Sequence, residues 1–146
     1  MSLIILVHHG DAVGPGVDPQ RPLSSAGRAA TERLAGLAAQ RGVKPEVIWH
    51  SGKLRARQTA ELFWKACNPF APLTAERGLL PDDPPQWMRD RLTGETRSVL
   101  IAGHMPYMPK LLAMLTGAGE ATSFPLHGCV ALEPDGDRWK EIWRLT

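Results

Sequence analysis

Two short, strongly apolar runs that end abruptly in glycine and histidine place the strongest constraint on the fold of this chain. Residues 3–7 (LIILV) are followed by HHGD, and residues 98–102 (SVLIA) are followed by GHMP. Short branched runs of this kind are typical of strands that are covered on both faces of a parallel sheet. Strands that end in titratable side chains and glycine indicate a site at the carboxyl edge of that sheet.

Helix and strand signals alternate between and around these two runs. After a loop rich in glycine and proline (residues 14–22), a helix is capped by Ser24 or Ser25 and stops at Gly42. The approximate apolar face of this helix consists of Ala26, Ala30, Leu34, Leu37 and Ala38. The remaining expected elements are a strand at 47–50, a helix at about 53–67 capped by Ser51, an edge strand near 73–75, a short helix at 86–92 and a helix from 106 to 115.

The C-terminal segment has the pattern of two strands around a tight turn, CVALEP and RWKEIWRL on either side of DG. Regular alternation in the second strand puts Trp139 and Trp143 on one face with Glu141. Alternating strands and helices followed by a hairpin predict a single domain over residues 1–146. We expect a three-layer α/β/α sandwich with a mostly parallel central sheet and the hairpin at its edge.

Composition excludes several classes of partner. The 146 residues are 43% hydrophobic and 22% charged, which is typical of a globular domain, and the formal net charge is only +2. This charge gives no reason to expect nucleic acid or a membrane as partner. Cys67 and Cys129 lie far apart without metal-ligand spacing, and no signal peptide is evident, so we expect a reduced, cytoplasmic protein.

Three strand ends carry the conspicuous polar residues: HHGDA (8–12), HSGKLRARQTA (50–60) and AGHMP (102–106). The carboxyl ends of parallel strands meet at one edge of a sheet, so these segments should form one crevice with a helix N-terminus beside it. Backbone donors at a helix N-terminus and arginine forks both favour a phosphate group. The side chains expected in this cationic region are His8, His9, His50, Lys53, Arg55, Arg57 and His104.

The order and position of these motifs resemble the histidine phosphatase superfamily. The strand followed by HG and an acid, the S-x-x-L-R-A-x-Q-T-A segment and the late G-H-x-P are the similar features, and RPLSSAGR (21–28) most resembles the SixA-type phosphohistidine phosphatases. The resemblance covers residues 3–110 and implies a phosphoglycerate mutase-like fold. It also implies hydrolysis of a phosphoryl group without metal or other cofactor.

By motif position, the resemblance assigns a role to each of four residues. His9 matches the nucleophile that carries the phosphoryl group, and His104 matches the second histidine, which stabilises charge during transfer. Arg55 matches a phosphate-binding arginine, and Arg21 resembles a residue that lines the same region in the short branch. The implied substrate is phosphohistidine on a protein, such as a histidine-phosphotransfer protein.

One departure from the family pattern concerns the residue before the nucleophile. The family begins R-H-G, whereas this chain has His8 in place of the arginine. If His8 faces the site, its protonated form should bind phosphate best, so affinity should rise as pH falls through about 6.5. Lys53 is a candidate to restore part of the lost charge. Asp82 and Asp83 are the candidate general acids.

Two alternatives remain open on the sequence alone. One is a phosphate-binding protein of the same family in which the missing arginine has lowered or abolished turnover. The other is a metal-dependent hydrolase that uses His8, His9, Asp11 and His104 as ligands. His50 is expected to pack or to form a supporting hydrogen bond, and His127 is expected to be a loop residue and not a ligand.

Overall fold

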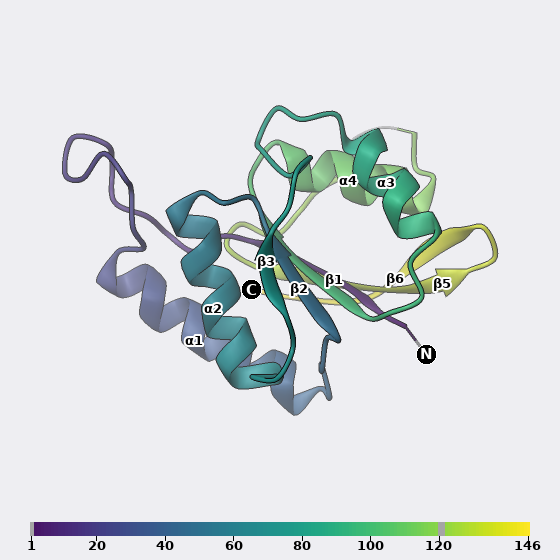
Figure 1. Cartoon of the computed structure of the whole chain (residues 1–146), viewed down its shortest axis with the longest axis horizontal. Coiled ribbons are helices and arrows are strands. Elements are labelled where there is room, and N and C mark those ends of the chain that lie inside the picture. The colour runs from purple at the N-terminus through teal and green to yellow at the C-terminus, as the bar shows by residue number, and fades with distance from the viewer. Residues whose placement is uncertain (1, 120–121) are drawn as a thin grey trace.

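A computed structural model describes residues 2–119 and 122–146 of this protein. Its centre is a single β-sheet with two helices on each face (Figure 1). The sheet of the described residues has six strands in the order β3-β2-β4-β1-β5-β6. The strands are β1 (Ile4–His8), β2 (Val47–His50), β3 (Leu73–Ala75), β4 (Val99–Gly103), β5 (Cys129–Asp135) and β6 (Arg138–Leu145).

Strands β1 to β4 are parallel to one another, β5 pairs antiparallel with β1, and β6 pairs antiparallel with β5 at the edge of the sheet. This arrangement confirms the predicted fold class. The parallel strands are covered on both faces, which explains why β1 and β4 are wholly buried and wholly apolar up to their last residues. No helix among residues 2–119 and 122–146 combines the length and apolar character that a membrane span requires.

Two separate hydrophobic cores fill the spaces between the sheet and the helices. Helices α1 (Ser25–Gln40) and α2 (Leu54–Cys67) cover one face, and α3 (Pro85–Thr93) and α4 (Tyr107–Thr116) cover the other (Figure 1). Large side chains such as Tyr107 fill the α3–α4 side, whereas α1 contributes mainly alanine.

The buried face of α1 differs by one position from the predicted face. Ser24 is the N-cap, with its hydroxyl accepting from Gly27 N–H, but Ala26 and Ala30 are exposed. The helix instead buries Gly27, Thr31, Leu34, Ala35 and Ala38. Small Gly27 and Thr31 let the helix approach the chain just after β1, where a Cβ on Gly27 would overlap the Asp11 carbonyl. Close approach to the loop after β1 at Gly27 and Thr31, together with burial of the apolar residues that follow them in the helix, therefore determines which face is buried.

The start of α2 also differs from the prediction, because Lys53 and not Ser51 is its N-cap. Lys53 makes no side-chain cap hydrogen bond. The Ser51 hydroxyl instead lies 2.6 Å from Nε2 of His104. Ser51 thus contributes to the site at the strand ends, while a weak 3.3 Å hydrogen bond links it to the Lys53 backbone N–H.

A β-bulge in the hairpin overturns the prediction that Trp139 and Trp143 share a face. The register shifts between Ala131 and Leu132, which pair with Trp143 and Glu141 respectively, so Ile142 has no opposite residue. An extra residue on one strand reverses the alternation beyond it. Trp139 accordingly packs on the α3–α4 core and Trp143 on the α1–α2 core.

Candidate active site

The residues that directly follow β1, β2 and β4 meet at one edge of the sheet. Strand β1 pairs with β4 so that His8 lies opposite Gly103, and the His9 N–H donates to the Gly103 carbonyl at 3.0 Å. This register places the ring of His9 5.1 Å from that of His104, in an edge-to-face arrangement. The predicted pairing of the two histidines at the strand ends is therefore present in the structure.

His9 is half-buried and oriented by its neighbour in the chain. Its Nδ1 lies 2.8 Å from the Gly10 carbonyl. A carbonyl can only accept, so Nδ1 carries the proton and Nε2 keeps its lone pair. Burial, and then the charges of Arg55, His127 and Arg21, lower the pKa of His9 to about 4, although the bond to Gly10 opposes this shift. His9 is therefore a neutral imidazole with a free nitrogen at neutral pH.

Helix α2 holds the backbone beside this histidine. The Thr59 hydroxyl accepts from the Gly10 N–H at 3.0 Å and donates to the Arg55 carbonyl at 2.8 Å. Gln58 accepts from the Leu23 N–H at 2.8 Å and so ties the loop after Arg21 to the same helix. The R-x-x-Q-T part of the motif thus has a structural reason, because it fixes the His9 loop relative to Arg55.

Two arginines supply positive charge next to His9. Arg55 is half-buried in the first turn of α2, and its Nε is buried without a hydrogen-bond partner among the described residues. Desolvation, followed by repulsion from Arg21, lowers the pKa of Arg55. Arg21 has a positive φ of 51° and donates from Nε to the Val13 carbonyl at 3.0 Å, which fixes its guanidinium in the loop. Two neighbouring guanidinium groups favour an anion between or beside them.

His104 lies deepest in the site and is 1% exposed. Its Nε2 bonds Ser51, whereas its Nδ1 is buried without a partner among the described residues. Desolvation, followed by the charges of His9 and Arg55, lowers the pKa of His104 to about 3. His104 is therefore neutral at physiological pH and can form one further hydrogen bond.

The structure changes the expectation for His8. Its Nδ1 accepts from the His127 backbone N–H at 2.8 Å, and its ring lies 4.5 Å from that of His9. Burial, with smaller contributions from His9 and His127, lowers the pKa of His8 to about 3. The predicted titration of His8 near pH 6.5 is therefore wrong, because a buried ring with a backbone donor on Nδ1 does not accept a proton. His8 lies beside His9, but it is not a cation.

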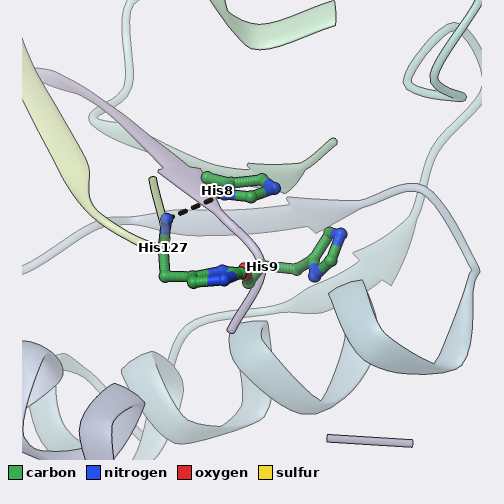
Figure 2. Close-up of side chains that lie close together, drawn as sticks. All are labelled: His8, His9 and His127. Atoms are coloured by element: carbon green, nitrogen blue, oxygen red, sulfur yellow. Dashed lines mark hydrogen bonds between the residues drawn. The ribbon is translucent and has the colours of Figure 1, made fainter. Parts of the chain in front are cut away.

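His127 is the residue of the site that sequence reasoning missed. Its ring stacks on His8 with centroids 4.9 Å apart and planes 9° apart, and its Nδ1 lies 2.7 Å from the His9 carbonyl (Figure 2). The predicted antiparallel hairpin contains the feature that could have placed His127 in the site. An antiparallel strand next to β1 begins at the edge where β1 ends, so the residue two positions before β5 lies beside His8.

Lys53 and the two aspartates line an open hollow in front of Arg55. Its lining consists of Lys53, Arg55, Leu80, Pro81, Asp82 and Asp83. The Asp83 carboxylate accepts from the Leu80 N–H at 2.9 Å and is thereby occupied in the loop, whereas Asp82 is exposed. Of the two candidate general acids, Asp82 has the freer carboxylate.

The other predicted polar residues have structural roles. His50 is buried, and its Nδ1 accepts from the Gly52 N–H at 3.0 Å. Arg57 is exposed and lies 3.8 Å from Glu61 in an ion pair. The Asp11 carboxylate accepts from the Ser24 hydroxyl at 2.8 Å. Asp11 therefore supports the start of α1.

The geometry opposes a metal centre, although His8, His9 and His127 have ring nitrogens within 4.8 Å of one another. An imidazole binds a metal ion with the lone pair that lies in the plane of its ring. The rings of His8 and His127 are stacked and nearly parallel, so their lone pairs do not converge. The Nδ1 atoms of all three residues are also engaged with backbone groups.

Comparisons with known proteins agree with this geometry. The family model of the histidine phosphatase superfamily (branch 1) matches residues 4–80, which is just over half of the chain. The chain therefore belongs to the histidine phosphatase superfamily. A search of curated proteins found no match.

Solved structures of high similarity include two SixA proteins. The protein histidine phosphatase SixA complexed with tungstate is 23% identical with a TM-score of 0.89, covering 99% of this chain and 96% of its own. A protein assigned as the phosphohistidine phosphatase SixA of Agrobacterium tumefaciens is 27% identical with a TM-score of 0.82, covering 99% and 97%. The phosphoserine phosphatase of Entamoeba histolytica, bound to 3-phosphoglyceric acid, is 11% identical with a TM-score of 0.75, covering 100% and 98%. These similarities establish the phosphoglycerate mutase-like fold.

Proposed function

We propose that this protein is a phosphatase that hydrolyses a phosphoryl group through a covalent intermediate on His9. The observation that carries the proposal is the hydrogen bond from His9 Nδ1 to the Gly10 carbonyl, which leaves Nε2 free beside Arg55, Arg21 and His104. A neutral, oriented imidazole among cations is suited to attack on phosphorus.

The reaction has two steps in this scheme. The Nε2 lone pair of His9 attacks phosphorus, and the bond from phosphorus to the leaving group breaks. Water then attacks the phosphorylated His9, which returns the imidazole and releases inorganic phosphate. Arg55, Arg21 and His104 bind the phosphoryl oxygens and stabilise the charge that develops on them. Asp82, exposed at the hollow next to Arg55, is the candidate that protonates an oxygen leaving group.

For the substrate we propose phosphohistidine on a protein, such as a histidine-phosphotransfer protein. The hollow in front of Arg55 is open and bounded by the loop at Leu80 and Asp82, which suits a phosphoryl group presented on a protein surface. An imidazole leaving group also needs less help from an acid than an alkoxide does. The tungstate complex and the name of the SixA neighbour support a phosphate-type anion in this fold.

The test compares phosphate release from a histidine-phosphorylated phosphotransfer protein and from phosphoserine at equal concentration. We expect faster release from the protein, and none with His9→Ala. Faster release from phosphoserine would overturn the proposed substrate. Phosphate binding without release from either would instead support the second candidate, a phosphate-binding protein, which the absence of the usual arginine at His8 favours.

A further inference from the structure

Neighbouring histidines at the end of β1 are held in opposite tautomers. The His127 N–H can only donate, so the Nδ1 that accepts from it in His8 carries no proton. The single proton of neutral His8 is therefore on Nε2. In His9 the Gly10 carbonyl requires the proton on Nδ1. One ring thus offers an N–H donor and the next offers a lone pair, both from Nε2.

The backbone of His127 is fixed by the hairpin. The residue has a positive φ of 53°, and Gly128 follows it directly. Gly128 accepts from the His8 N–H at 3.0 Å and donates to the Pro125 carbonyl at 3.0 Å. A Cβ on Gly128 would overlap the Leu145 carbonyl of β6. The N–H of His127 is therefore held in a fixed position relative to His8 by main-chain contacts on both sides.

The ring of His127 makes a second, independent contact. Its Nδ1 lies 2.7 Å from the His9 carbonyl, so it must donate there. Figure 2 shows the three rings together, with His8 over His127 and the second nitrogen of His8 directed away from that partner. One residue thus fixes the His8 ring through its main chain and the His9 main chain through its ring.

We propose that His127 is a positioning residue that presents His8 as a neutral N–H donor to the phosphoryl oxygens and holds the backbone of the nucleophile His9. This inference rests on the proposed function of His9. It explains how the site works without an arginine before the nucleophile: the position supplies a directed hydrogen bond in place of a charge. Such a donor can neither form a bidentate fork nor attract an anion over a distance.

Burial, and then the neighbouring histidines, lower the pKa of His8 and oppose its protonation. The groups facing it among the described residues are His9 on its own strand end, His127 before β5 and His104 after β4. A proton on Nδ1 would also break the bond to the His127 N–H. His8 therefore remains the same neutral donor between pH 6 and pH 8.

The first test reads the tautomers directly. Nitrogen-15 labelling of histidine and long-range proton–nitrogen correlation distinguish a protonated from a bare ring nitrogen, and the single variants His8→Gln, His9→Gln and His127→Asn assign the signals. We expect protonated Nε2 in His8 and protonated Nδ1 in His9 and His127. A His8 that carries its proton on Nδ1, or is doubly protonated at pH 6, would overturn the proposal. This result does not depend on turnover, so failure of the proposed function would be seen separately.

The second test measures inorganic phosphate affinity by calorimetry at pH 6 and pH 8. His8→Asn keeps an oxygen for the His127 N–H, but its shorter side chain cannot place an N–H donor where Nε2 of His8 lies, so phosphate should bind about tenfold more weakly than to the parent. The ratio between the two proteins should be equal at both pH values, because the ionisation of phosphate cancels. A loss seen only at pH 6 would identify His8 as a cation and overturn the proposal.

The third test separates positioning from folding. His127→Ala removes the ring contact to His9 and should lower kcat about tenfold while KM changes little. His127→Asn tolerates the left-handed backbone and offers a short donor, so it should recover part of kcat. Leu126→Ala, at a neighbouring side chain that is 66% exposed, is the control. If Asn and Ala lose kcat equally, or if KM rises in step, the ring of His127 has no positioning role.

Discussion

At the scale of single residues, Arg55 is the side chain whose shape is expected to matter most for phosphate. Its buried Nε lacks a partner among the described residues, and Arg21 repels it. Arg55→Lys keeps the charge but loses the fork, so we expect kcat/KM to fall by about 10- to 100-fold, the equivalent of one lost charged hydrogen bond. Steady-state kinetics on a phosphorylated substrate measures this.

The control for this prediction is Arg57→Lys. Arg57 lies on the same helix but is exposed and paired with Glu61. Exposed ion pairs contribute little, so this variant should keep the kinetics of the parent. If both variants behave alike, Arg55 does not bind the phosphoryl group through its fork.

The residue scale also shows where prediction from the sequence stops. His9 and His104 could be placed together because each directly follows a buried strand, and parallel strands end at one edge. The protonation state and tautomer of His8 could not be predicted, because they depend on burial and on the backbone N–H of His127, 119 positions away. No local pattern reports such a contact.

At the scale of elements, the contact between α1 and the loop after β1 fixes the position of His9. A Cβ on Gly27 would overlap the Asp11 carbonyl, which is backbone and cannot rotate away. Gly27→Ala should therefore lower stability and activity, although alanine is favoured over glycine in a helix by about 1 kcal/mol. Urea unfolding and turnover are the measurements.

Gly36 offers a matched control in the same helix, since a Cβ there meets nothing within 4 Å. Gly36→Ala should raise the free energy of unfolding by about 0.5–1 kcal/mol and leave turnover unchanged. If Gly27→Ala and Gly36→Ala change the free energy of unfolding and turnover equally, the contact between α1 and the loop after β1 does not position His9.

Most elements could be predicted from periodicity and capping residues. The two faces that were predicted wrongly are both determined by contacts with another element of the fold. The predicted face of α1 was one position off because Gly27 and Thr31 face the chain just after β1, where only small side chains fit. The face of Trp143 was wrong because the register shift between Ala131 and Leu132 reverses the alternation. Both outcomes depend on the partner element, which the local sequence does not contain.

At the scale of the whole molecule, the buried neutral histidines make stability depend on pH. Burial lowers the pKa of His8, His9 and His104 to about 3, 4 and 3, while the unfolded chain titrates near 6.5. The folded state thus binds fewer protons than the unfolded state below pH 6.5. The stabilising contribution of the three neutral histidines is therefore complete above pH 6.5. As pH is lowered from 6.5, the free energy of unfolding should fall by up to about 1.4 kcal/mol per pH unit for each histidine.

Urea unfolding at pH 7.5, 6.5, 5.5 and 5.0 measures this slope. Among the described residues, the two carboxylates with a lowered pKa, Glu95 (about 2) and Glu76, affect stability mainly below their unfolded value of 4.5, so they do not account for this slope. His104→Gln should reduce the slope in this range. A free energy of unfolding that stays constant from pH 7.5 to 5.0 would mean that the three histidines take up protons in the folded state.

The covalent phosphoryl group on His9 is the central claim of this account, and it can be trapped. The protein is incubated with labelled phosphoramidate, quenched in base to preserve the acid-labile bond and fragmented so that His8 and His9 are distinguished. We predict a single phosphoryl group on His9 in the parent and no label in His9→Ala. Label on His8, His104 or His127, or label that persists in His9→Ala, would contradict the account.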